Sequence, residues 1–439
     1  MTSEEQDLVD FVTTQRWFGS KTRDVVHASI VDHATIGPGD PSLELLLVEI
    51  RFDTGTHETY QLLRRDDLGV LADPDAASEL VRLIRRGTTV AGSEGTVELI
   101  PVAESFAGVA DEVTVTRQIG VEQSNTSVVL DDSLILKVFR RLEPGVNPEL
   151  ELLRFLTEHG FEHIPRLAGW YQYVGRPMES TLGILQQFVP DGRDGWELAL
   201  ETLGSRTEWF LHQLEALGRV TAELHTVLGS DPTDPSFAPE QTSSESLGLL
   251  TATVDEEIEA IFLDLPDEDP ELEPLRGRGE EVRERLRLLT NLGGVGRVIR
   301  HHGDFHLGQA LHTEGGWVLI DFEGEPARSL PERRRKRSPL RDVAGMLRSF
   351  AYVASAGPLR GVVPPPNWEE RARSVFLDAY RENVDPSLMP SGAAMDKLLQ
   401  VFELEKAVYE LRYELNNRPD WLPIPVAGIV RLLDAEVPV

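Results

Sequence analysis

The sequence contains no cysteine among its 439 residues. Disulfide bonds and cysteine-ligated metal centres are therefore excluded, and this composition fits a cytoplasmic protein. No apolar run reaches the ~18 residues that would suggest a membrane-spanning helix, and the first residues are acidic and polar, unlike a signal peptide. The sequence therefore predicts a folded protein with no membrane segment.

Basic residues are scarce beside acidic ones, 43 against 74, so the formal net charge is −31. A surface this negative repels nucleic acid and anionic membranes, and neither is expected as a partner. It also repels a nucleoside triphosphate at long range. A nucleotide site in this chain would therefore need local basic residues and a metal ion.

The length predicts about two to four domains. Strand-like and helical patterns alternate up to about residue 190, and the rest is mostly helical. We expect an α+β chain with a small cap at residues 1–88, an intermediate region with the smaller lobe at residues 89–190, and a helical lobe at residues 191–439.

The most informative stretch is His302-Gly303-Asp304-Phe305-His306-Leu307-Gly308-Gln309, with Ile320-Asp321-Phe322-Glu323 after a predicted hairpin. Protein kinases use the same order: an Asp that takes the substrate hydroxyl proton, an amide five residues later, and a second Asp on Mg²⁺. The pattern predicts Asp304 as the catalytic base and Gln309 and Asp321 as metal ligands. The alternative is that both aspartates are ordinary turn residues.

Lys137 is a lone cation in the apolar strand predicted at residues 134–139. A buried ammonium needs a paired anion, and kinases pair such a lysine, which contacts the nucleotide phosphates, with a helix glutamate. Asn147 and Pro148 predict a helix start. On that helix Glu151 is the preferred partner and Glu149 the alternative, and an edge-strand lysine in water is the competing interpretation.

Two further segments are predicted to contact the nucleotide. Small polar residues at Ser124, Asn125 and Thr126 lie between two strand-like runs, where hydroxyls and backbone N–H groups could hold phosphate oxygens. A plain polar hairpin is the alternative. The apolar run that ends at Pro190 predicts a strand leading into a hinge, where the backbone of Gln187 and Val189 would meet the base.

A helix predicted over residues 395–416 carries aromatic and acidic side chains along one stripe. Stacked rings and carboxylates suit a sugar, whose faces stack and whose hydroxyls bond to acids. An exposed helix with incidental tyrosines is the alternative. The predicted substrate residues are Tyr409, Glu410, Tyr413 and Glu414 of this helix, Trp421 shortly after it, and His306 and Glu323 of the two motifs above.

Two cationic segments stand out in this acidic chain. Residues 333–337 are five successive cations, which could offset nucleotide charge or form a solvated loop. Near the N-terminus, Arg16-Trp17-Phe18 is followed by Lys21 and Arg23, which suits either a contact surface or, more commonly, a packing anchor. Asp342 begins a predicted helix, and an Asp at that place in kinase-like folds braces the catalytic loop.

Taken together, these motifs resemble those of actinobacterial maltokinases, a branch of the aminoglycoside-phosphotransferase-like kinases. The segments that carry the resemblance span nearly the whole chain: Gln15-Arg16-Trp17, Glu122-Gln123-Ser124-Asn125-Thr126-Ser127, Ile135-Leu136-Lys137-Val138-Phe139-Arg140-Arg141, the stretches around Asp304 and Asp321, Ser338-Pro339-Leu340-Arg341-Asp342-Val343-Ala344-Gly345, Lys406-Ala407-Val408-Tyr409-Glu410 and Arg418-Pro419-Asp420-Trp421-Leu422-Pro423-Ile424-Pro425.

The resemblance implies a bilobal, protein-kinase-like (aminoglycoside phosphotransferase-like) fold with an N-terminal cap. It implies transfer of phosphate from ATP, with Mg²⁺, to the anomeric hydroxyl of maltose, giving maltose 1-phosphate for α-glucan (glycogen) synthesis. It implies trehalose synthase as a candidate partner protein. We expect the protein itself to be a monomer.

Three alternatives remain open at this stage. A related branch of the family phosphorylates glucosamine, but it tends to carry an Asp-Phe-Asp-Gly-Asn turn where this chain has Asp-Phe-Glu-Gly-Glu at residues 321–325. A nucleotide-binding pseudokinase is disfavoured because Lys137, Asp304 and Asp321 are all present. A protein kinase is disfavoured because the chain lacks a glycine-rich loop and an Ala-Pro-Glu segment.

Overall fold

The computed structural model covers residues 1–439 and describes residues 3–36, 42–65, 68–69, 73–102, 105, 113–119, 125–241, 244–266, 269–287, 296–390 and 392–435. It divides into two units, Met1–Asp191 and Gly192–Val439. The predicted cap and the predicted intermediate region with the smaller lobe therefore belong to one unit. Within the described residues, no helix combines the length and the apolar character that crossing a membrane requires.

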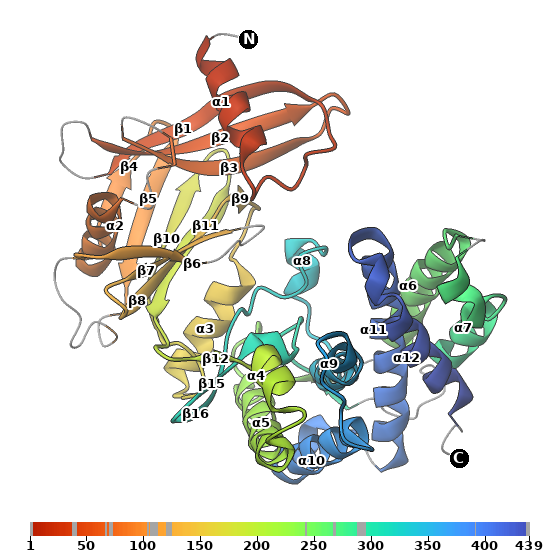
Figure 1. The fold of residues 1–439 in the computed structure, drawn as a ribbon. Helices are drawn as coiled ribbons and strands as arrows, with labels where there is room; N and C mark the ends of the chain where they lie inside the picture. The colour runs from red at the N-terminus through yellow and green to blue at the C-terminus, as the bar shows by residue number, and fades with distance from the viewer. Residues whose placement is uncertain are drawn as a thin grey trace. The chain divides into compact units, whose positions relative to one another are not determined.

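The first unit is built on antiparallel sheets (Figure 1). One has the strand order β1-β2-β3-β9 and the other β4-β5-β10-β11-β8-β7-β6. The elements of this unit are α1 (Ser3–Thr14), β1 (Val25–Ile36), β2 (Leu43–Phe52), β3 (His57–Arg64), α2 (Pro74–Arg86), β4 (Thr89–Ala91), β5 (Gly95–Pro101), β6 (Thr116–Ile119), β7 (Asn125–Leu130), β8 (Leu134–Phe139), β9 (Arg141–Leu142), α3 (Pro148–Glu158), β10 (Leu167–Gly175) and β11 (Glu179–Gln187).

The second unit is mainly helical, with two small sheets of order β12-β15-β16 and β13-β14. Its elements are β12 (Arg193–Asp194), α4 (Gly195–Thr202), α5 (Thr207–Leu228), β13 (Glu240–Gln241), α6 (Ser244–Leu263), η3 (Pro270–Leu275), α7 (Gly279–Arg287), β14 (Arg297–Val298), η5 (Leu307–Gln309), β15 (Ala310–Thr313), β16 (Gly316–Leu319), α8 (Leu330–Arg333), α9 (Leu340–Leu359), α10 (Trp368–Asn383), η6 (Pro386–Leu388), α11 (Ala393–Asn417), η7 (Pro419–Trp421) and α12 (Pro423–Asp434).

Local sequence signals set several of these boundaries. α3 begins where the sequence predicts it, because the Asn147 side chain caps the helix by accepting a hydrogen bond from the Glu149 N–H at 2.8 Å and Pro148 occupies the first turn. α2 ends at Gly87, whose φ of 64° is left-handed and suits glycine. β8 pairs with β11 on one side and β7 on the other, so Lys137 does not lie on an edge strand.

The two sheets of the first unit are joined by a buried carboxylate. Asp32 on β1 is 2% exposed and accepts hydrogen bonds from the N–H groups of Ser93 and Glu94, at 2.7 and 3.1 Å, in the β4–β5 turn. The Tyr173 hydroxyl of β10 donates to the same carboxylate at 2.5 Å. Burial tends to raise the pKa of Asp32, but these hydrogen bonds outweigh it and hold the pKa below its ordinary value.

Replacing this carboxylate should destabilise the first unit. We expect Asp32→Ala to lower the free energy of unfolding by about 2–4 kcal/mol, because it leaves buried donors without an acceptor. Asp53→Ala, in the exposed β2–β3 turn, should change it by less than about 0.5 kcal/mol. Urea unfolding followed by circular dichroism measures both, and equal effects would contradict the joining role of Asp32.

Candidate active site

A buried carboxylate holds the loop that carries Asp304. Asp342, in the first turn of α9, accepts hydrogen bonds from the N–H groups of His302 and Gly303 at 2.7 and 2.9 Å. It is 2% exposed, and its pKa is strongly lowered: burial opposes ionisation, but His301, His225 and His302 favour the charged form. The prediction that Asp342 braces the catalytic loop is confirmed.

His225 of α5 completes this support. Its Nε2 lies 3.1 Å from Asp342 Oδ2, and its Nδ1 lies 2.9 Å from the Tyr380 hydroxyl. Because a carboxylate only accepts, Nε2 carries a proton toward Asp342.

The candidate catalytic base is paired with a lysine. Lys406 of α11 places its Nζ 3.1 Å from Asp304 Oδ1, and each side chain is about three-quarters buried, with 28% and 24% exposed respectively. Burial alone would raise the pKa of Asp304, but the Lys406 ammonium holds it below its ordinary value. The same pairing raises the pKa of Lys406. Asp304 is therefore ionised throughout the neutral range.

Lys406 is a functional residue that the sequence reasoning did not assign. It lies in one of the segments that carry the family resemblance, 102 residues from Asp304 in the sequence. The available signal was a cation that directly follows the apolar and acidic run Phe402-Glu403-Leu404-Glu405.

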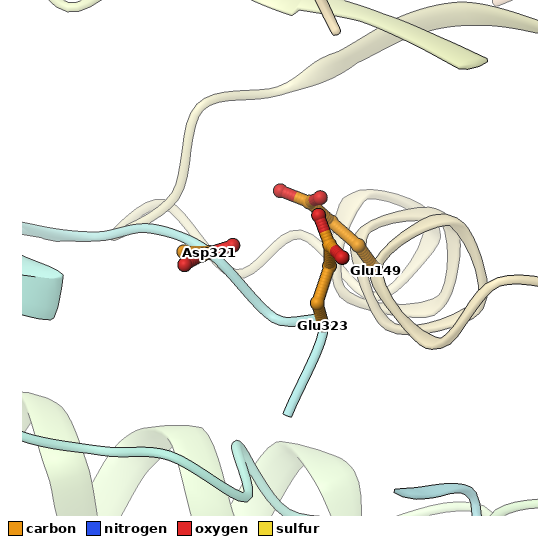
Figure 2. Close-up of side chains that lie close together, drawn as sticks. All are labelled: Glu149, Asp321 and Glu323. Carbon is orange, nitrogen blue, oxygen red and sulfur yellow. The ribbon is translucent and has the colours of Figure 1, made fainter. Parts of the chain in front are cut away.

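The two predicted metal ligands lie together. The Gln309 side-chain amide donates to Asp321 Oδ2 at 3.2 Å. Figure 2 shows Asp321 and Glu323 on the turn after β16, where Asp321 takes a left-handed φ of 62° that is uncommon outside glycine. Carboxylate and amide oxygens are the donors that Mg²⁺ prefers, so Asp321 and Gln309 fit the role of metal ligands. Glu323 stays a predicted substrate residue, and its carbonyl accepts from Arg333 at 3.3 Å.

In the first unit, Lys137 is paired with a different glutamate from the one preferred in the sequence analysis. Lys137 Nζ lies 2.8 Å from Glu149 Oε2, with the two side chains 9% and 1% exposed. Glu149, the third side chain labelled in Figure 2, stands in the first turn of α3. Glu151 lies about 200° further around the helix, so the preference for Glu151 is corrected in favour of the alternative, Glu149.

The other predicted nucleotide residues remain predictions. Ser124 lies outside the described residues, and Asn125 and Thr126 begin β7 with buried side chains. The Thr126 hydroxyl accepts a hydrogen bond from Arg140 Nε at 2.8 Å. Gln187 ends β11 and its N–H donates to the Arg166 carbonyl at 2.9 Å, while Val189 follows in a half-buried position.

The predicted sugar residues separate into two groups. Tyr409 lines a cavity with Asp304, Lys406 and Glu325, and burial followed by the Glu325 carboxylate raises the pKa of Tyr409 to about 12. His306 does not line this cavity. Its Nδ1 accepts from the Gly308 N–H at 3.1 Å, and burial lowers its pKa although Asp304 opposes this effect.

The remaining residues of the α11 stripe have partners within the second unit, and their assignment as direct sugar contacts stays a prediction. Glu410 accepts two hydrogen bonds from Arg348, at 2.7 and 2.9 Å. Glu414 is 1% exposed and bonds to Arg418 and the Tyr352 hydroxyl. Arg418 lies over the rings of Tyr413 and Trp421. The stripe is thus an ion-pair network, since helical spacing alone does not distinguish salt bridges from ligand contacts.

The basic segment at residues 333–337 is mostly engaged within its own unit. Lys336 donates to the Pro235 and Ala238 carbonyls at 2.8 and 2.7 Å and pairs with Glu240 at 2.6 Å. Arg337 lines the cavity beside Asp304. Its pKa falls to about 10 because of burial and the neighbouring arginines. The solvated-loop alternative is therefore wrong for these two residues.

Comparison with known proteins gives the family. Residues 115–362, more than half of the chain, match the model described as the phosphotransferase enzyme family, and residues 11–78 match the maltokinase N-terminal cap domain. The chain belongs to this family of phosphotransferases. The predicted bilobal α+β fold with an N-terminal cap is confirmed.

Named relatives include glucosamine kinases. The enzyme from Streptacidiphilus jiangxiensis is 27% identical over 91% of this chain and 97% of its own length. One from Mycolicibacterium smegmatis is 27% identical over 72% of this chain and 79% of its own length. A solved glucosamine kinase in complex with glucosamine, ADP and inorganic phosphate superposes with a TM-score of 0.73 at 22% identity, covering 97% of this chain and 98% of that one.

Separate substitutions of Glu149 and Glu151 test which of the two glutamates of α3 is the functional partner of Lys137. We expect Glu149→Gln to raise the KM for the nucleotide more than about tenfold, because Lys137 loses its buried counter-charge. Glu151→Gln, the matched change two residues away, should stay within about threefold of the wild type. The reverse order of effects in steady-state kinetics would restore Glu151 to the role.

Removing the lysine should alter the pH dependence of the reaction. In Lys406→Met, burial is left to raise the pKa of Asp304, so the acidic limb of kcat/KM should move upward by about one pH unit or more. Lys397→Met, on the same helix, is the control and should keep the wild-type profile. An unmoved limb in Lys406→Met would show that Lys406 does not set the ionisation of Asp304.

Proposed function

We propose that the protein is an ATP-dependent sugar kinase. The observation that supports this most strongly is the Asp304–Lys406 pair, held on a loop braced by Asp342 and facing a cavity of the second unit. Phosphoryl transfer needs positioning and charge stabilisation more than covalent chemistry. A fixed, ionised carboxylate beside a cavity supplies the positioning for a hydroxyl acceptor.

The residues divide the work as follows. Asp304 orients the acceptor hydroxyl and accepts its proton, while Lys406 keeps Asp304 ionised. Asp321 and Gln309 would hold Mg²⁺, which when bound neutralises charge on the phosphates. Lys137, held by Glu149, contacts the nucleotide phosphates.

We propose maltose as the acceptor, phosphorylated at its anomeric hydroxyl to give maltose 1-phosphate for α-glucan synthesis. The match of residues 11–78 to the maltokinase cap domain supports this choice. The charges of the cavity also support it. Asp304 is paired with Lys406, Glu325 with Arg328 at 2.8 Å and Glu405 with Arg341 at 2.8 Å, whereas Arg337 adds a cation.

These pairings favour a neutral sugar beside Asp304, because an ammonium sugar would need an uncompensated carboxylate there; Glu257 also lines the cavity. Glucosamine is nevertheless the second candidate, because the curated relatives at 27% identity are glucosamine kinases. A complex with trehalose synthase and a monomeric state stay predictions.

An acceptor panel tests the proposal. The purified protein is incubated with ATP, Mg²⁺ and, separately, maltose, glucosamine, glucose and maltotriose, with ADP release as the readout. We expect the highest kcat/KM with maltose, and phosphorus and carbon NMR should place the phosphate on C1. A preference for glucosamine would select the second candidate, and ADP release with none of the sugars would overturn the sugar-kinase proposal.

Asp304→Asn should reduce kcat by several orders of magnitude, because the amide cannot accept the hydroxyl proton. The nucleotide affinity of this variant should stay near that of the wild type. Asp420→Asn, an exposed change in η7, serves as the control and should retain full turnover. Near-normal turnover in Asp304→Asn would remove this residue from its catalytic role.

A further inference from the structure

The first unit contains a second cavity, whose lining includes Asn125 and Thr126 of the predicted nucleotide residues but neither Lys137 nor Glu149. Its volume is about 390 Å³, and it lies between the end of α1 and the strands β6 and β7. The described residues that line it are Phe11, Thr14, Gln15, Arg16, Trp17, Gly69, Gln118, Ile119, Asn125, Thr126, Ser127 and Arg140.

This lining is cationic in a strongly anionic protein. It includes two arginines, and no carboxylate appears among the described residues that form it. The whole chain has a formal charge of −31. A small anion would be repelled by most of this protein's surface, so a region that gathers guanidinium groups without acids is a place where one could be held.

Arg140 is the most telling of these residues. It is 4% exposed, and within the part of the chain that the structure describes its contacts are the Thr126 hydroxyl, at 2.8 Å from Nε, and the Trp17 ring, at 5.5 Å. Neither is an anion. Burial lowers its pKa to about 10, and the one neighbour that opposes this effect is the Tyr171 phenol. A buried guanidinium without a carboxylate is costly unless something else supplies the negative charge.

The side-chain contacts of Arg140, the residue that follows β8, differ from those of Lys137 within the strand. Lys137 reaches Glu149 on α3, whereas Arg140 lines the cavity with Arg16 and Trp17. Arg140 therefore offers an anion contacts different from the Lys137–Glu149 pair proposed to hold the nucleotide phosphates.

We propose that this cavity binds the phosphate group of a small phosphorylated sugar. Arg140 and Arg16 match a phosphate, which planar guanidinium groups recognise with paired donors. Gln15, Gln118 and Thr14 provide neutral polar groups for sugar hydroxyls, and Phe11 and Trp17 provide apolar wall. The site is separate from the proposed acceptor site, so its test does not depend on turnover.

Isothermal titration of the full-length protein with glucose 1-phosphate tests the proposal. The titration is run with saturating ADP and Mg²⁺, so that the nucleotide site is filled. We expect saturable binding that weakens at least tenfold in Arg16→Gln and in Arg140→Met. Arg176→Gln, an exposed arginine of the same unit that does not line the cavity, should bind as the wild type does.

Other probes identify what is recognised. Glucose should not bind at this site, because it lacks the anion. Inorganic phosphate should bind more weakly than glucose 1-phosphate, and equal affinity would overturn the sugar part of the proposal while supporting the anion part. Thermal melting shows whether the Arg140→Met variant is folded. If that variant is unfolded, Arg16→Gln still tests the proposal, because Arg16 is exposed and its replacement should not disturb folding. Absence of binding, or unchanged binding in Arg16→Gln, would overturn the proposal.

Discussion

The second unit depends on one buried anion. Asp342 has no solvent to stabilise its charge, so two backbone N–H groups of the catalytic loop and the His225 imidazole must do so. This requirement fixes the loop: any movement of His302 or Gly303 away from α9 would leave a buried carboxylate under-bonded, which is energetically costly. Asp304 follows directly and inherits that rigidity. The placement of Asp304, the proposed catalytic base, is therefore a consequence of the hydrogen bonds that its buried neighbour Asp342 requires.

Charged side chains elsewhere in the chain are also held in place by their counter-charges. A protein with a net charge of −31 that transfers phosphate has to arrange its cations where they act. The structure does so by pairing: Lys406 with Asp304, Arg348 with Glu410, Lys137 with Glu149. Each pair holds a cation at a fixed place, because breaking a buried pair leaves an uncompensated charge. The ion pairs are better understood as positioning devices than as sources of net stability.

How much of this was accessible from the sequence depends on the range of the interaction. Asp304, Gln309 and Asp321 could be proposed as one site because their spacing is local, and the Asn147 cap was predicted correctly because helix caps have a short-range signature. Glu149 and Glu151 could not be separated, since both lie on one helix and only its rotation against β8 decides between them. The pairing of Lys406 with Asp304, of Arg348 with Glu410 and of Tyr352 with Glu414 depends on contacts made 62 to 102 residues apart, which no periodicity encodes.

The cap adds a last constraint. β9, which immediately follows Arg140, pairs with β3 of the cap sheet, and Asp32 of β1 bonds to the turn between β4 and β5. The cap thus shares side-chain hydrogen bonds with the sheet that includes β8, the strand of Lys137. Because packed interfaces of this kind resist continuous deformation, a ligand held by Arg140 would act on the residue that directly follows this strand. The cap is therefore placed to influence Lys137, the lysine proposed to contact the nucleotide, through β8.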